Sequence, residues 1–71
     1  MNTEQRVNML IRQIEECISQ YKSKPSSSYL NDFERYKVMV ETILDKYNNY
    51  EKLEHLVDIE LPRLIRDARQ L

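Results

Sequence analysis

The stretch that decides the fold is FERYKVMVETILDKYNNYEKLEHLVDIELPRLIRDARQL, which covers residues 33–71. Apolar residues recur along it at alternating steps of three and four, and only Glu54 interrupts the series. The series consists of Phe33, Tyr36, Val40, Ile43, Tyr47, Tyr50, Val57, Leu61, Leu64, Ala68 and Leu71. This spacing is typical of helices that pack against other helices, so it predicts an all-α fold.

The first third of the chain carries another apolar stripe at helical spacing. We predict a helix over residues 3–22, which Asn2 or Thr3 can cap. One face of this helix holds Val7, Leu10, Ile11, Ile14, Cys17, Ile18 and Tyr21. A continuous apolar face of this kind indicates a helix that packs on a core.

A loop and a second helix follow. Pro25 and the serines after it predict a loop over residues 23–28, because proline removes a backbone donor and disfavours helix in the residue before it. Ser28 is a suitable N-cap for a second helix over residues 29–48. Val38 lies on the side of this helix opposite its apolar face.

We predict a third helix over residues 50–70. Pro62 either kinks this helix, because it cannot donate to the carbonyl of Asp58, or begins a short fourth helix. The kink is the favoured interpretation. The segments have similar lengths, which predicts a single domain over residues 1–71: a small three-helix bundle with coiled-coil-like packing and a tight turn at Asn48–Asn49.

A second architecture also fits the apolar pattern. The register passes through Asn48–Asn49 without a slip, so one helix could continue from Tyr29 to the end of the chain. Such a helix would be about twice as long as the first, and its uncovered half would need another chain. The alternative is therefore an unequal helical hairpin that dimerises.

The composition limits the classes of function. Eleven basic and twelve acidic residues give a formal net charge of −1, which argues against a general nucleic-acid or membrane-surface footprint. The chain has no glycine, which argues against phosphate loops and hairpin turns. No apolar run suits a signal peptide or a spanning helix, and Cys17 is the only cysteine, so we expect a cytoplasmic protein.

We find no residue set for catalysis, for a cofactor or for a metal ion, and we predict that the protein is not an enzyme. His55 shares a helix surface with Glu51 and Asp58, but a polar outer face excludes no water, so we expect a solvated histidine. Cys17 lies late in a helix beside Glu16, where a thiolate is disfavoured, so we expect a buried small apolar residue.

The candidate partner-binding residues are of three kinds. Tyrosines suit a boundary between core and partner, because they combine apolar area with a hydroxyl. Apolar residues off the stripes would mark a contact patch if they cluster. Arginines on the last helix can contact acidic groups. The set comprises Tyr36, Tyr47, Tyr50, Met9, Val38, Ile59, Arg63 and Arg66.

These features favour a small non-enzymatic protein–protein interaction module, such as an adaptor, inhibitor, co-chaperone or regulator. It would bind another protein, or a second copy of itself, through helical faces. The alternative is a nucleic-acid-binding regulator that uses the arginine-bearing C-terminal helix. The neutral charge weighs against nucleic acid, and we expect no membrane partner.

The stripe assignment predicts the effect of a charge placed in the core. Ile14→Asp or Val40→Asp should unfold the domain, because each variant would bury an unpaired carboxylate. Circular dichroism and thermal melting of the two variants measure this effect. A variant that keeps full helicity and a cooperative melt would show that the core is assigned wrongly.

Overall fold

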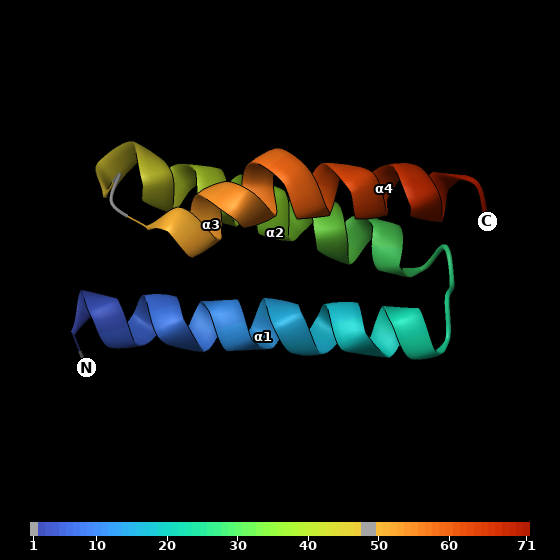
Figure 1. Cartoon of the computed structure of the whole chain (residues 1–71), viewed down its shortest axis with the longest axis horizontal. Helices are drawn as coiled ribbons and strands as arrows, with labels where there is room; N and C mark the ends of the chain where they lie inside the picture. Colours follow the sequence, from blue (N-terminus) through green and yellow to red (C-terminus); the bar gives the residue numbers. More distant parts are fainter. Residues whose placement is uncertain (1, 48–49) are drawn as a thin grey trace.

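The computed structural model describes residues 2–47 and 50–71, and Figure 1 shows the arrangement of their helices. The elements are α1 (Thr3–Ser23), α2 (Tyr29–Lys46), α3 (Glu51–His55), the π-helical turn η1 (Leu56–Glu60) and α4 (Leu61–Arg69). No strand occurs in these two ranges. The predicted all-α class is therefore confirmed.

The last three elements form one helical rod, so three helices pack together as predicted. Leu56 and Leu61, which join the elements of the rod, both have right-handed helical backbone angles. Figure 1 shows α2 along this rod and α1 beneath, running antiparallel to α2. The extents of 37 × 20 × 16 Å are those of a short bundle.

A reciprocal pair of hydrogen bonds begins α1. The Gln5 backbone N–H donates to Asn2 Oδ1 at 2.8 Å, and the Asn2 N–H donates to Gln5 Oε1 at 3.3 Å. These bonds satisfy donors that the start of a helix otherwise leaves free. Of the two predicted caps, the structure uses Asn2.

α2 begins at Tyr29 with Ser28 at its N-cap position, but the expected capping bond is absent. Ser28 has helical angles (φ −64°, ψ −22°), and its side chain makes no capping bond to the helix. The turn is formed by Ser26, whose Oγ accepts from the Ser28 N–H at 3.2 Å and whose carbonyl accepts from the Tyr29 N–H at 3.2 Å. The prediction is therefore right about the position of Ser28 and wrong about its side chain, because an earlier serine forms the turn.

The alternative architecture, with one continuous helix from Tyr29 onward, is wrong. α2 ends at Lys46, and Tyr47 is extended (φ −135°, ψ 97°). Tyr50, which precedes α3, is extended as well (φ −111°, ψ 92°). A helix cannot run through two extended residues, so α2 and the 51–69 rod are separate. The tight turn predicted at Asn48–Asn49 lies outside the described residues.

The rod contains a wide turn where the sequence predicts a kink. The Leu61 N–H donates to the carbonyl of Leu56, five residues earlier, which is the π-helical pattern. Pro62, the next residue, has no N–H and cannot make the α-helical bond to the carbonyl of Asp58. The chain thus remains helical through the proline, and the irregularity lies in the turn before it.

This π turn sets which residues of α4 face the core. If the rod were a regular α-helix from Leu53 and Val57, its inward positions would fall on Glu60, Leu64 and Asp67. The one extra residue of a π turn moves each position on by one. The residues buried there are Leu61, Ile65 and Ala68. Ile65, absent from the predicted stripe, is inward for this reason, and Leu64 is half-buried.

One core joins all the helices. Its buried side chains are Val7, Ile11, Ile14, Ile18, Tyr21, Phe33, Tyr36, Val40, Leu53, Leu56, Val57, Leu61, Ile65 and Ala68. An aromatic cluster closes the end near the first loop: the Tyr21 ring meets Phe33 edge-on with centroids 5.1 Å apart, and meets Tyr29 at 5.6 Å. The Tyr21 hydroxyl also donates to the Asp67 carboxylate, which ties α1 to α4.

The π turn predicts an unusual tolerance to deletion. Removing Asp58 should convert η1 to a regular α-helix and keep Leu61, Ile65 and Ala68 facing inward. The matched deletion is Glu16, an exposed residue in α1, where no wide turn can absorb the change. That deletion rotates Ile18 and Tyr21 by about 100° out of the core.

Denaturant unfolding of both deletion variants tests this expectation. The chain without Asp58 should keep a cooperative transition, whereas the chain without Glu16 should lose it, since each displaced side chain forfeits about 1.5–3 kcal/mol of burial. Equal damage from the two deletions would contradict the role of the π turn in setting the register.

Candidate partner-binding surface

Most of the predicted partner-binding residues lie on the surface. The exposed members are Met9, Val38, Tyr47, Ile59, Arg63 and Arg66. Tyr50 is half-buried at the edge of the core. Tyr36 is only 8% exposed, so it belongs to the core and has almost no surface to offer a partner.

The three apolar residues off the stripes do not gather into one patch. Met9 lies on α1, Val38 lies on α2 and Ile59 lies on η1. Met9 and Val38 line separate hollows, and Ile59 lines neither of them. The structure instead groups Met9 and Tyr47 with apolar residues outside the predicted set.

A groove of about 400 Å³ lies between the start of α1 and the end of α2; we call it the α1–α2 groove. Its main lining residues are Arg6, Leu10, Met39, Ile43, Lys46 and Tyr47. Met39 and Tyr47 are 41% and 46% exposed, and Leu10 and Ile43 are half-buried. Large apolar side chains therefore form the floor of an open groove.

A second hollow lies next to the groove along α1, and Arg12 and Glu16 line it together with apolar residues. It is lined in part by Met9, which is 56% exposed, and it shares Arg6 and Leu10 with the α1–α2 groove. The two hollows are therefore adjacent. Sequence reasoning missed Met39, although its spacing of four residues from Ile43 was a usable signal.

The charge of the α1–α2 groove has one sign. Arg6 and Lys46 both line it, and its other lining residues carry no charge. Neither cation takes part in an ion pair with another described residue. The groove thus combines an apolar floor with two cations and no carboxylate.

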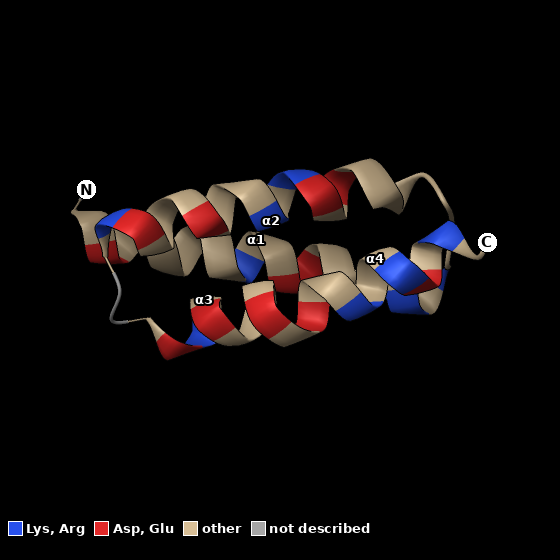
Figure 2. Ribbon diagram, turned by 90° about the horizontal axis from the view of Figure 1, so that it is seen from above, with Lys and Arg blue, Asp and Glu red and all other residues tan. Residues whose placement is uncertain are grey.

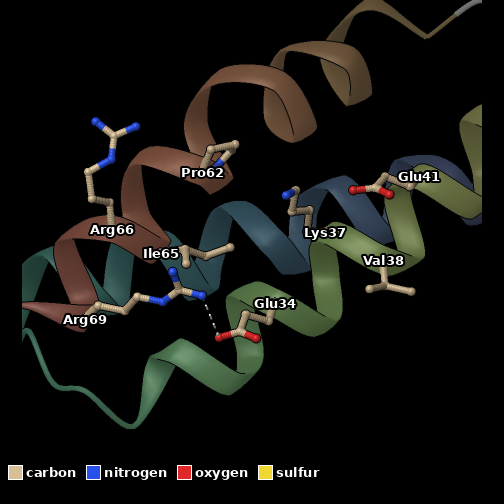
Figure 3. Close-up of a pocket in the computed structure, with 8 residues that line it drawn as sticks. All are labelled: Glu34, Lys37, Val38, Glu41, Pro62, Ile65, Arg66 and Arg69. Atoms are coloured by element: carbon tan, nitrogen blue, oxygen red, sulfur yellow. Dashed lines mark ion pairs between the residues drawn. The ribbon is translucent and has the colours of Figure 1, made fainter.

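The groove between α2 and α4 has a different character. It measures about 420 Å³, and Figure 3 shows Val38 and Arg66 among its lining residues. Glu34 and Glu41 line it too, and Arg69 Nη2 lies 4.0 Å from Glu34 Oε1. Charges of both signs alternate here, which is typical of a solvated surface between two helices.

Charges along the 51–69 rod change sign from one end to the other. In Figure 2 the ribbon is coloured mostly for Asp and Glu along α3 and the turn after it, and mostly for Lys and Arg along α4. Cations near the end of a helix also complement its macrodipole. The positions of Arg63 and Arg66 are therefore explained by helix electrostatics as well as by a partner.

The carboxylate near His55 is Glu60, which is neither of the two residues that share its predicted helix surface. Its Nε2 lies 3.5 Å from Glu60 Oε1, five residues on, because both residues belong to the region of the π turn. The two side chains are about half exposed. Within the described ranges, no three His, Cys, Asp or Glu side chains are placed to hold a metal ion.

Three hydroxyl or thiol groups have altered acidity. The hydrogen bond to Asp67, followed by burial, raises the pKa of Tyr21 to about 12. Burial raises the pKa of the Cys17 thiol, and the nearby Asp32 carboxylate adds to this. Burial also raises the pKa of Tyr36. All three groups are thus held in their neutral forms, which favours packing over nucleophilic chemistry.

Comparison with known proteins gives no relative: no family model, no curated protein and no solved structure matches this chain. Across residues 2–47 and 50–71, no helix combines the length and the apolar character that crossing a membrane requires. Evidence about function therefore comes from the surface of the bundle itself.

The Tyr21 hydroxyl predicts a pH dependence of stability. An unfolded tyrosine ionises near pH 10, so the folded chain, with a pKa of about 12 at Tyr21, binds this proton more tightly. The stabilisation is complete below about pH 10 and is lost as the pH rises toward 12.

Denaturant unfolding between pH 10 and 12 measures this loss. Stability should fall less steeply in Tyr21→Phe than in the wild type. Tyr47→Phe, which removes an exposed hydroxyl, is the matched control and should follow the wild type. If the wild type and Tyr21→Phe lose stability in parallel, the Tyr21–Asp67 bond does not contribute.

Proposed function

We propose that this chain is a small non-enzymatic protein–protein interaction module that binds another protein through a helical face. The observation that supports this most is the apolar surface of the α1–α2 groove. Met39 and Tyr47 remain about half exposed there, and Met9 is similarly exposed in the adjacent hollow, beside a core that is already closed. Exposed apolar side chains that gather around a groove are typical of protein-binding sites.

The residue types in the groove also suit binding. Methionine has an unbranched, polarisable side chain that adapts to the shape of a partner; Met39 lines the groove, and Met9 lines the hollow next to it. Tyr47 provides apolar area with a hydroxyl that can stay in water. Burying the exposed half of each anchor would contribute about 1 kcal/mol, so these side chains supply part of a moderate affinity.

The nucleic-acid alternative has less support. Arg66 and Arg69 share their groove with Glu34 and Glu41, and Arg69 lies close to Glu34. Carboxylates beside the arginines would repel phosphate groups. No observation on α4 favours nucleic acid over an acidic protein, so this alternative enters only as an outcome of the test below.

A photo-crosslinking amino acid at one of two adjacent positions tests the proposal. Met39 and Val38 are neighbours on α2, but they line different grooves, so Val38 is the matched control. The probe at Met39 should form a discrete adduct with one protein in cells that contain the chain, and the probe at Val38 should not. Mass spectrometry of the adducts is the measurement.

The other outcomes are equally informative. An adduct from Val38 alone would move the binding surface to the α2–α4 groove. Nucleic acid in the adducts would support the alternative function. Absence of any protein adduct from both positions, in a chain that circular dichroism shows to be folded, would contradict the proposed function.

A further inference from the structure

We infer that the α1–α2 groove receives an amphipathic helix of a partner protein whose apolar face is flanked by Asp or Glu. This deepens the proposed function, on which it rests, because it specifies the chemistry of the partner. Three features of the groove favour this partner: its shape, its apolar floor and its charge.

The shape suits a helix. The walls of the groove are two antiparallel helices, with Leu10 on α1 facing Met39 and Ile43 on α2. A third helix can lie between two helices by placing its ridges in their groove. From Met39 to Lys46 the α2 wall extends roughly 10 Å at the helical rise per residue, which corresponds to about two turns of a docked helix.

The apolar floor of the α1–α2 groove favours a partner helix with an apolar face. Met39 and Ile43 are separated by one helical turn on the same wall, and Tyr47 closes that wall just after α2 ends. A partner helix would meet this wall with apolar side chains at positions i, i+3, i+4 and i+7, the usual anchors of a helix in a groove. Met9 extends the contact along α1 through the adjacent hollow.

The positive charge of the α1–α2 groove favours acidic residues on either side of the partner's apolar face. Arg6 on the α1 wall and Lys46 on the α2 wall are both exposed, and the groove contains no carboxylate to neutralise them. Asp or Glu beside the apolar face of a partner would meet these cations, whereas Lys or Arg would be repelled. Complementary charges of this kind determine which partners are accepted.

The same charges disfavour a second copy of this chain. In a symmetric dimer through this groove, each copy would present the same patch. The two copies would together bring four cations and no carboxylate into the interface, and these like charges would repel. A phosphate backbone is disfavoured as well, since the floor between the two cations is apolar.

A peptide library tests the inference with the full-length chain. The library displays helices of fixed Leu positions at i, i+3, i+4 and i+7, with randomised flanking residues. Selection on the wild type should enrich Asp and Glu in the flanks. A chosen acidic peptide should bind at least about tenfold more weakly to the double variant Arg6→Glu, Lys46→Glu, and its lysine-flanked counterpart should show the opposite preference.

Two further variants locate the contact. Met39→Glu should weaken binding of both peptides, because it places a carboxylate in the apolar floor. Val38→Glu, the control on the neighbouring groove, should leave both affinities unchanged. Circular dichroism of each variant checks that the fold is intact, so a loss of binding is assigned to the groove.

Each opposing result has a distinct meaning. Neutral or basic flanks, or no enriched helix, would overturn the inference; a protein adduct from Met39 in cells would then leave the proposed function standing. If light scattering shows a dimer that the double variant dissociates, a second copy occupies the groove and the inference is wrong. Failure of both the library and the crosslinking would remove the proposed function as well.

Discussion

The constraint that governs this structure is that 71 residues must bury apolar stripes from three helical rods in one core, with a single cysteine and no glycine. Chains this short bury only about 60% of the surface that they expose when unfolded, so a stable fold has to bury the apolar side chains of every stripe. Phe33, Leu53 and Leu61 are completely enclosed. No helix can enclose such a side chain alone, so α1, α2 and the 51–69 rod depend on one another.

The π turn allows the 51–69 rod to meet this constraint, because it changes which residues of the rod face the core. In a regular helix continued from Leu53 and Val57, Glu60 and Asp67 would lie nearer the centre of the core-facing side than Leu61 and Ala68. With the extra residue of the π turn, Asp67 lies at the surface, where it accepts the hydrogen bond from Tyr21. The core that results is closed on its inner faces. Of the large apolar side chains that stay exposed, Met39 and Tyr47 line the α1–α2 groove and Met9 lies beside it, whereas Val38, Ile59 and Leu71 lie elsewhere. The candidate binding surface is thus a consequence of how the core closes.

Much of the fold is readable from the sequence, because each apolar stripe repeats at helical spacing. The buried face of α1 and the break at Pro25 follow from residue type and position alone. The inward position of Ile65 does not, because it depends on one extra residue in a turn that a regular period cannot anticipate. The sequence also places Met9 and Tyr47 among the candidate binding residues but omits Met39, since grouping residues from two helices requires their relative orientation.

The central claim is that α1 is a full member of one cooperative core, so that the α1–α2 groove exists before any partner arrives. Native-state amide hydrogen exchange tests this most directly, because it gives a free energy of opening for each helix. The account predicts that the most protected amides of α1, α2 and α4 open with the same free energy as global unfolding. If α1 opens at a much lower free energy while α2 and α4 stay protected, the groove is not a stable surface and the account is wrong.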